Sequence, residues 1–402
     1  MKQKTRSSLD YYNEVLSKII TKKRTFTNKV VLVRVDFNVP LKQGKITDDS
    51  RIRQSLQTIN YLLERGATVV CVSHMGRPKG RDESYSLKPV AKKLSALLKE
   101  KVVLIEPGTI DTAAASRVYL YENLRFFDGE KKNSRAFAKV LAQGCDYYVN
   151  DAFGTAHRQH ASNSAILSYL PSYIGFLMQK EITFLKTVLE APSPLVVIIG
   201  FAKIGDKVSI LEQLLKNADT VLVGGAVAFT FLQAQGVFVG KSLVDTPSIL
   251  IAKQFLKKYG SKMILPEDVV VARSLSAKQS KTIPIEKMTS TVAGFDIGPH
   301  TVKEFQSYLK DARMVFWNGP TGVFEVKPYD GSTNMLCKTI ATQSSKNGLV
   351  SIVGGGDTVS AVKKSGKSAK FTHLSTGGGA SLAFFEKKPL VAVKNMVLKS
   401  NI

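Results

Sequence analysis

Short apolar segments rich in β-branched residues alternate with amphipathic helical segments along most of the chain. The strand-like segments are residues 30–35, 68–73, 118–120, 147–149, 195–199, 220–223, 314–316 and 349–353. Nearly continuous apolar strands that alternate with helices of about 10 to 15 residues are typical of parallel sheets covered on both faces. At 402 residues the chain is too long for one ordinary core, so the pattern predicts two doubly wound, Rossmann-like α/β domains.

The boundary between the predicted domains falls near Pro171. A long helix is expected over residues 178–189, and the Ala-Pro-Ser-Pro segment at 191–194 ends it, because proline cannot continue a helix. We therefore predict an N-terminal domain of residues 1–172. The C-terminal domain is predicted over residues 173–388 and includes the helix, which is expected to act as a hinge.

The first 29 residues are polar and basic. Tyr12 and Leu16 recur at helical spacing with other apolar residues, which favours a short amphipathic surface helix. A targeting sequence is the alternative, and Asp10 and Glu14 disfavour it. No apolar run in the chain is long enough to span a membrane.

Charge and cysteine usage narrow the classes of function. The formal net charge is +25, and the excess of basic residues is spread over both halves of the chain. A nucleic-acid-binding protein more often concentrates such charge in one stripe, so a general attraction for anions is the simpler inference. Cys71, Cys145 and Cys337 are far apart and lack a CxxC pattern, which predicts a reducing, cytoplasmic location.

Polar and cationic residues follow the strands of the first half of the chain. In an open parallel sheet the carboxyl ends of the strands face one crevice, where these side chains should converge. The residues are Arg51, His74, Arg77, Arg125 and Arg158. A single arginine is usually a solvated surface charge, but five such groups at matching strand ends predict a site for a small, multiply anionic molecule.

Two glycine triplets follow strand-like segments in the second half, at residues 354–356 and 377–379. Each reads as a strand, a tight turn and the start of a helix, where unpaired backbone N–H groups can bind phosphate. Asp357 is then a candidate carboxylate ligand of Mg²⁺ between protein and phosphates. An ordinary helix N-cap is the alternative at this position. Neither turn matches the Walker or dinucleotide consensus.

Seven motifs in order resemble the phosphoglycerate kinase family. They are Val-Arg-Val-Asp-Phe-Asn-Val-Pro (33–40), Ser-His-Met-Gly-Arg-Pro (73–78), Glu-Asn-Leu-Arg-Phe (122–126), Asn-Asp-Ala-Phe-Gly-Thr-Ala-His-Arg (150–158), Trp-Asn-Gly-Pro-Thr-Gly-Val-Phe-Glu (317–325), Gly-Gly-Gly-Asp-Thr (354–358) and Ser-Thr-Gly-Gly-Gly-Ala-Ser (375–381). The resemblance implies a kinase that transfers a phosphoryl group reversibly between 1,3-bisphosphoglycerate and ADP in glycolysis. The products would be 3-phosphoglycerate and ATP, and Mg²⁺ would be required.

The resemblance also implies the residues of both sites. Phosphoglycerate would bind Asp36, Phe37, Asn38, Arg51, His74, Met75, Gly76, Arg77, Arg125 and Arg158. The nucleotide would bind Lys203, Lys207, Gly224, Gly225, Asn318, Glu325, Gly355, Gly356, Asp357 and Thr358, with Asp357 toward the metal. Arg51 and Lys203 are the candidates for catalytic charge stabilisation. The tail at 389–402 would return to the first domain.

Several expectations accompany this assignment. We expect a monomer that closes about its hinge, small-molecule substrates as its partners, and no membrane or specific nucleic acid. Phe201 stands where the family usually has glycine or another small residue, and Ala226 replaces the third glycine of a usual Gly-Gly-Gly. Both lie on the expected path of the nucleotide. The alternatives are another α/β kinase or ligase, and a catalytically weak, basic nucleic-acid-binding protein on the same fold.

Overall fold

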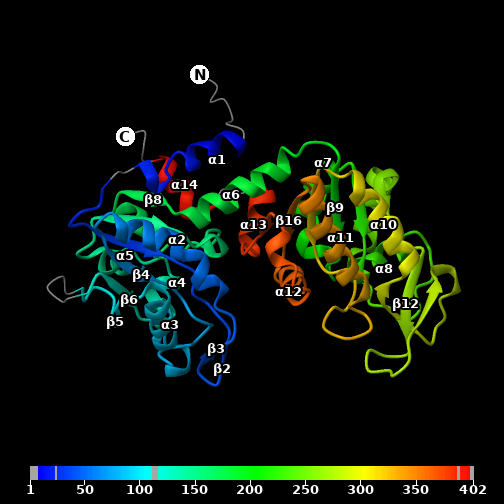
Figure 1. The fold of residues 1–402 in the computed structure, drawn as a ribbon, viewed down its shortest axis with the longest axis horizontal. Coiled ribbons are helices and arrows are strands. Elements are labelled where there is room, and N and C mark those ends of the chain that lie inside the picture. Colours follow the sequence, from blue (N-terminus) through cyan, green and yellow to red (C-terminus); the bar gives the residue numbers. More distant parts are fainter. Residues whose placement is uncertain (1–7, 23–24, 111–115, 387–389, 399–402) are drawn as a thin grey trace. The chain divides into compact units, whose positions relative to one another are not determined.

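Two six-stranded sheets, both entirely parallel, organise the chain (Figure 1). The computed structural model describes residues 8–22, 25–110, 116–386 and 390–398. The first sheet contains β1 (Val30–Arg34), β4 (Thr68–Val72), β5 (Val102–Ile105), β6 (Val118–Tyr121), β7 (Tyr147–Asn150) and β8 (Ser172–Ile174). The second contains β9 (Leu195–Ile199), β10 (Thr220–Val223), β11 (Met263–Ile264), β15 (Met314–Asn318), β16 (Val350–Gly354) and β17 (His373–Leu374). The predicted fold class is confirmed.

The sheets belong to two compact units. Unit 1 extends to Thr183 and includes the C-terminal helix α14 (Val391–Leu398), and unit 2 is Phe184–Glu386. The other helices of unit 1 are α1 (Ser8–Leu16), α2 (Ser50–Glu64), α3 (Lys88–Leu98), α4 (Asp128–Lys131) and α5 (Arg135–Ala142). The division falls within α6 (Phe176–Leu189).

The strand order in unit 1 is β5-β6-β4-β1-β7-β8. The chain starts at the central strand β1, builds the sheet to one side, and then crosses to β7 on the other side. This order places a topological switch point at the carboxyl ends of β1 and β7, the type of place where open α/β sheets bind ligands. A hairpin of β2 (Leu41–Lys42) and β3 (Lys45–Ile46) follows β1.

Unit 2 has the strand order β11-β10-β9-β15-β16-β17, which is the Rossmann order with its switch point between β9 and β15. Its helices are α7 (Val208–Asn217), α8 (Gly225–Ala234), α9 (Ile249–Tyr259), α10 (Pro299–Asp311), α11 (Gly331–Asn347), α12 (Gly356–Lys364) and α13 (Gly379–Phe385). A separate antiparallel sheet of β12 (Asp268–Ala272), β13 (Lys281–Pro284) and β14 (Ala293–Ile297) joins this unit. The sequence patterns did not predict it.

Apolar residues on the central strands explain why these segments lie inside. All five residues of β1, of β9 and of β15 are buried, as expected for strands covered on both faces. Trp317 is fully buried in the main core cluster of unit 2. Its indole N–H donates to the Gly319 carbonyl at 2.8 Å, so the ring also fixes the turn that follows β15.

Helix α6 begins within unit 1. Asp151, which follows β7, accepts hydrogen bonds from the backbone N–H groups of Leu177 and Met178 at 2.8 and 3.2 Å. These bonds satisfy N–H groups that the first turn of a helix leaves unpaired. Burial raises the pKa of Asp151 to about 6. The N-terminal helix α1 packs on α14, and its Tyr12 and Val15 are buried, so the apolar face predicted for this segment belongs to the core.

None of the helices in the described part of the chain combines the length and the apolar character needed to cross a membrane.

Candidate active site

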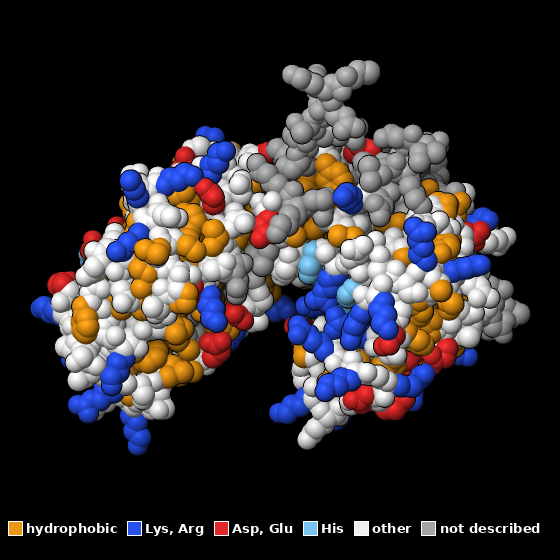
Figure 2. Space-filling model, turned by 180° about the vertical axis from the view of Figure 1, so that it is seen from behind, with side chains coloured by type: hydrophobic (Ala, Val, Ile, Leu, Met, Phe, Trp, Pro, Cys, Tyr) orange, Lys and Arg blue, Asp and Glu red, His pale blue; other side chains and the backbone are white. Residues whose placement is uncertain are grey.

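The first candidate site lies beyond the carboxyl ends of the strands of unit 1. Asp36 follows β1, His74 follows β4, and Arg125 follows β6. Four arginines lie close enough to His74 for their charges to lower its pKa, although burial has the larger effect. They are Arg34, Arg125, Arg158 and Arg51. Figure 2 shows basic side chains gathered beside histidines on this unit.

Asp36 is the carboxylate at the centre of this arginine cluster. Its Oδ2 accepts a hydrogen bond from Arg51 Nη1 at 2.5 Å, and its Oδ1 lies 4.0 Å from His74 Nδ1. Asp36 is only 8% exposed. A buried carboxylate needs such partners, and in return it orients the Arg51 guanidinium, which remains partly accessible.

Asn38, Gly76 and Arg125 connect the ends of three strands. Asn38 Oδ1 accepts from the Gly76 N–H at 2.9 Å, and Arg125 Nη1 donates to the Gly76 carbonyl. Asn123 lies beneath them: its Oδ1 accepts from Met75 N–H at 3.0 Å and from Arg125 N–H at 3.1 Å. These hydrogen bonds to the Asn38 and Asn123 side chains hold the loops in place and leave the arginine charges unneutralised.

The arginines repel one another. Burial, together with the charges of Arg158, Arg34 and Arg77, lowers the pKa of Arg125 to about 10. The pKa of Arg158 is also lowered, chiefly by burial. Arg125 Nε is buried and has no hydrogen-bond partner among the described residues. Crowded cations with an unsatisfied donor have the chemistry that an anion-binding site needs.

The remaining residues predicted for unit 1 differ in how far their side chains are exposed to solvent. The Phe37 side chain is fully buried and Met75 is 3% exposed, so both pack in the core. Their backbone N–H groups bind Ser73 Oγ and Asn123 Oδ1, respectively. Arg77 is exposed and contributes to the positive field of the cluster.

Arg34 is a member of the cluster that the sequence patterns missed. It is 1% exposed and lies on β1 between two valines. Its Nε donates to Ser162 Oγ at 2.9 Å, and its Nη2 lies 3.3 Å from His74 Nδ1. Ser162 Oγ in turn donates to Glu130 Oε1 at 2.6 Å. The only sequence signal was a charge inside an apolar strand, which indicates a buried, partnered group.

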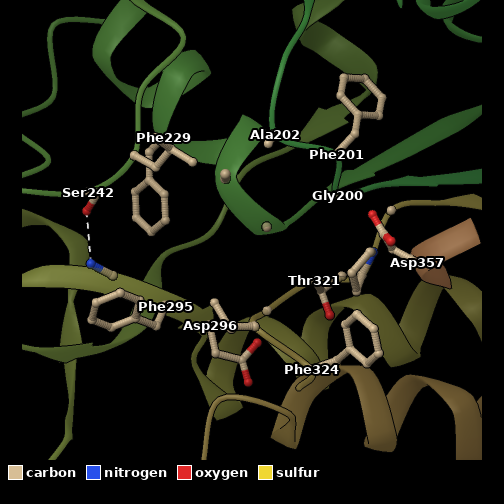
Figure 3. Close-up of a pocket in the computed structure, with 18 of the residues that line it drawn as sticks. Gly200, Phe201, Ala202, Phe229, Ser242, Phe295, Asp296, Thr321, Phe324 and Asp357 are labelled. Carbon is tan, nitrogen blue, oxygen red and sulfur yellow. Dashed lines mark hydrogen bonds between the residues drawn. The ribbon is translucent and has the colours of Figure 1, made fainter. Parts of the chain in front are cut away.

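The second candidate site is a cavity of about 1110 Å³ in unit 2, beside the switch point between β9 and β15 (Figure 3). Nine of the ten residues predicted for the nucleotide line it: Lys203, Lys207, Gly225, Asn318, Glu325, Gly355, Gly356, Asp357 and Thr358. Gly224 does not line it and packs on Thr321. The volume suits a nucleotide-sized ligand.

The turn between β10 and α8 requires glycine. Gly225 has a φ of +56°, and a Cβ on it would lie 2.3 Å from the Gly200 carbonyl oxygen. Its N–H donates to the Thr321 carbonyl at 2.9 Å. The turns after β9, β10 and β15 therefore touch through their backbones, which gives the cavity a smooth wall.

The turn that carries Lys203 and Lys207 is fixed by Asp245. The Asp245 carboxylate accepts hydrogen bonds from the N–H groups of Ile204 and Gly205 at 2.8 and 3.4 Å. Burial raises the pKa of Asp245, but hydrogen bonds and the charge of Lys203 lower it more, so that the net shift is downward. Lys203 is exposed at the cavity.

The first glycine triplet leads into α12, as predicted. Gly355 occupies the N-cap position with a φ of 87°. Thr358 Oγ1 accepts from the Gly319 N–H at 2.7 Å, which ties this helix to the turn after β15. Asp357 is exposed at the cavity. The second triplet follows the neighbouring strand β17, but its glycines are not among the lining residues.

The antiparallel sheet supplies a wall that the sequence did not indicate. Phe295 and Asp296 of β14 line the cavity (Figure 3), and Ser242 Oγ accepts from the Gly294 N–H at 2.9 Å. Asp296 is 3% exposed, and it accepts hydrogen bonds from the N–H and the hydroxyl of Ser332. Burial raises the pKa of Asp296 to about 7. Nothing in the Phe-Asp-Ile sequence itself marks Asp296 as a residue of a cavity.

Known proteins resemble the chain over almost its whole length. The family model described as phosphoglycerate kinase matches residues 21–388. The phosphoglycerate kinase of Finegoldia magna is 46% identical over 381 residues, which cover 91% of this chain and 95% of that protein. The solved structure of phosphoglycerate kinase from Coxiella burnetii has a TM-score of 0.85 and 39% identity, with 94% of this chain and 98% of that chain covered. The Pyrococcus horikoshii enzyme has a TM-score of 0.83 and 32% identity, covering 96% of this chain and 100% of that one.

Unit 1 carries a cluster of cations suited to an anion, and unit 2 carries a glycine-walled cavity of nucleotide size. Together with the family match, these features define a phosphotransferase, here one with a carboxyl group as acceptor. The chain belongs to the phosphoglycerate kinase family. Its reaction is the reversible transfer of a phosphoryl group between 1,3-bisphosphoglycerate and ADP in glycolysis.

Proposed function

We propose that unit 1 holds the phosphoglycerate and unit 2 holds the nucleotide. The observation that carries this division is the crowding of arginines around one buried, neutral imidazole in unit 1. Arg51, Arg125 and Arg158 would bind the carboxylate and phosphate oxygens, because planar guanidinium groups match both in a bidentate manner. Asp36 and Asn38 would hold the loops and a substrate hydroxyl. The cavity in unit 2 would take the base, the ribose and the phosphates.

Arg51 and Lys203 are proposed as the catalytic residues. Phosphoryl transfer demands little covalent chemistry from the protein, but it requires cations on the equatorial oxygens of the transferred group. Asp36 orients Arg51, and Asp245 fixes the turn that presents Lys203. Both cations would stabilise the charge that develops in the transition state. The reaction needs no nucleophilic serine or cysteine.

Mg²⁺ is the proposed metal. Within the described residues no three His, Cys, Asp or Glu side chains form a metal-binding group, so a protein cage does not fit. A single carboxylate does fit, because Mg²⁺ is often held by one or two carboxylates together with substrate phosphates. Asp357, at the start of α12 beside the cavity, would be that carboxylate. When bound, the ion would neutralise phosphate charge.

We also propose that catalysis requires a closing motion. The two ligands would bind different units, whereas in-line transfer needs their oxygens within a few ångströms and water excluded. Helix α6, which passes from one unit to the other, would act as the hinge. Because a ligand shifts a conformational equilibrium only through differential affinity, closure should depend on both substrates. Small-angle scattering of the free, singly liganded and doubly liganded protein tests this. Full compaction with nucleotide alone would contradict it.

We propose that the protein acts as a monomer in the cytoplasm, where its glycolytic substrates occur, and binds no specific nucleic acid. The alternative of a basic nucleic-acid-binding protein is not favoured, because the cations of unit 1 converge on one small site. Any binding to polyanions should be weak and vanish near physiological salt. Tight binding that persists in about 0.3 M salt would revive the alternative.

The division of substrates can be tested with two reciprocal variants. Arg125→Met should weaken binding of 3-phosphoglycerate by roughly 10- to 100-fold, the scale of a lost charged hydrogen bond, and leave ADP affinity unchanged. Lys207→Met should weaken binding of ADP and leave the affinity for 3-phosphoglycerate unchanged. Isothermal titration of the full-length protein with each ligand measures both, and each variant is the control for the other. Loss of both affinities in either variant would refute the division.

A further inference from the structure

Phe201 and Lys207 are in contact at the edge of the cavity. The Lys207 ammonium nitrogen lies 5.3 Å from the centroid of the Phe201 ring, which is within the range of a cation–π interaction. Both residues line the cavity. Figure 3 shows the Phe201 ring on the far side of Gly200 from Thr321 and Phe324. The ring therefore does not occupy the space between the glycine turns.

The backbone on both sides holds the ring in place. The Phe201 carbonyl accepts from the Val227 N–H of α8 at 3.0 Å. The turn after β15 also packs closely, since a Cβ on Gly319 would lie 2.2 Å from the Phe201 nitrogen. Phe201 is 8% exposed. Because the Phe201 backbone is held on both sides and its side chain is nearly buried, the ring face can act as a support for the lysine.

Lys207 differs from its neighbour Lys203 in its surroundings. Lys203 is exposed, whereas Lys207 is half-buried at the start of α7. A lysine side chain has four flexible bonds, and a ligand that binds it must order them. The negatively charged face of an aromatic ring keeps an ammonium group close without neutralising it. The contact therefore orders Lys207 in advance and leaves its charge for an anion.

We propose that Phe201 is a positioning residue, whose ring holds the Lys207 ammonium ready for the phosphates of the nucleotide. This inference rests on the proposed role of Lys207 in nucleotide binding. The ring supports binding through the lysine and makes no contact of its own with the phosphates. Its removal should weaken the nucleotide complex only while Lys207 is present.

The test is a double-mutant cycle on the full-length enzyme. Phe201→Leu, which keeps the apolar volume, should raise the KM for ADP and its dissociation constant roughly three- to tenfold, the scale of a partly desolvated cation–π contact. The kcat at saturating ADP should be unchanged. Phe201→Tyr, which keeps the ring face, should behave like the wild type. In a Lys207→Met background, Phe201→Leu should have no further effect.

A matched control is Phe295→Leu. Phe295 also lines the cavity, but its ring packs on Tyr329, with 4.9 Å between the centroids. Any effect of this change should be the same with Lys207 and with Met at position 207. Thermal unfolding of each variant separates lost affinity from lost folding.

Two results would overturn the inference. Tighter ADP binding in Phe201→Leu would mean that the ring withholds the lysine from the ligand, and equal losses in Phe201→Leu and Phe201→Tyr would exclude the ring face as the cause. A different result would contradict the proposed role of Lys207, namely unchanged ADP affinity in the single variant Lys207→Met.

Discussion

The two candidate sites are built from different parts of the chain. In unit 1 the ligand-facing groups are long cationic side chains, oriented by Asp36 and Asn38 and supported from below by Asn123. In unit 2 much of the wall is backbone, because the turns that contain Gly200 and Gly225 touch directly. A small, multiply charged molecule is best held by guanidinium groups, whereas a flat base and a phosphate chain need close approach to backbone N–H groups.

This difference predicts different responses to mutation. A side chain in unit 1 can be shortened without moving the backbone, so that binding is lost and the fold remains. The turns of unit 2 that contain Gly200, Gly225 and Gly319 have no room for added atoms, so a change there affects fold and site together. Burial and the neighbouring arginines lower the pKa values of Arg125 and Arg158, so the cluster is expected to lower stability, as is common where a site is arranged for a ligand.

The largest effect is expected from the exposed cation of the second site. Lys203→Met should lower kcat by roughly two orders of magnitude or more, the scale of removing one transition-state donor. Binding of both substrates should be nearly intact. Steady-state kinetics with both substrates varied measures the two quantities.

Lys216→Met is the matched control, because Lys216 is an exposed lysine on the adjacent helix α7 and should be neutral. A raised KM with near-normal kcat in Lys203→Met would mean that Lys203 only binds, and that unit 2 contributes backbone and binding groups alone.

A smaller effect is expected from a single methyl group in unit 2. Gly225→Ala adds a Cβ at a φ of +56° and 2.3 Å from the Gly200 carbonyl oxygen. The free energy of unfolding should fall by about 2 kcal/mol or more, and ADP affinity should fall with it. Urea unfolding and ADP titration test this. Gly260→Ala, which has no positive φ and open space around it, should change neither. A stable, tight-binding Gly225→Ala protein would show that the wall is adaptable.

Sequence patterns predicted the regular part of the fold well. The segments expected as strands at 195–199 and 220–223 coincide with β9 and β10. Helix α6 starts at Phe176, two residues before the predicted start. Buried parallel strands are continuous apolar runs, and that signal is local. The convergence of strand-end cations followed from topology alone, whereas the identity of each ligand-binding residue stays a prediction.

Groups whose partners are remote in sequence could not be predicted. Arg34 interrupts an apolar strand, and its partner Ser162 lies 128 residues away. The β12, β13 and β14 sheet was missed because β13 is short, mostly exposed and ends in Pro284. Asp296 became recognisable only through its contact with Ser332, 36 residues along the chain. Such pairings depend on long-range packing, which periodicity does not encode.

The pH dependence of stability should reveal the buried acid of unit 2. Burial raises the pKa of Asp296 to about 7, above its ordinary value of 3.8. Between these values the folded state binds more protons than the unfolded state, so Asp296 should lower stability progressively as pH rises from 4 to 7, by at most about 1.4 kcal/mol per pH unit.

Asp296→Asn should therefore flatten the decline of the unfolding free energy over this range. Denaturant unfolding at several pH values measures the slope. Asp330→Asn, which removes the charge beside Asp296, should flatten it only slightly. An identical slope in wild type and Asp296→Asn would mean that Asp296 is ionised throughout the range.

The smallest effect is expected from removing one arginine of the cluster in unit 1. Burial and neighbouring arginines lower the pKa of Arg125 to about 10, so the folded state disfavours its charged form at all pH values below 10. Arg125→Met should then raise the free energy of unfolding at pH 7, by no more than about 1 kcal/mol, since the group is only half-buried. The lost bond to the Gly76 carbonyl offsets part of the gain.

Arg53→Met is the control for this comparison, because Arg53 pairs with Asp49 at an exposed position and its loss should not increase stability. Added 3-phosphoglycerate should reverse the order of stabilities: it stabilises the wild type by binding the folded state, whereas the variant binds it weakly. Destabilisation of ligand-free Arg125→Met by more than about 1 kcal/mol would show that Arg125 supports the fold. The arginine cluster would then not be a source of repulsion that lowers stability, and the proposed difference between the side-chain site of unit 1 and the backbone site of unit 2 would be contradicted.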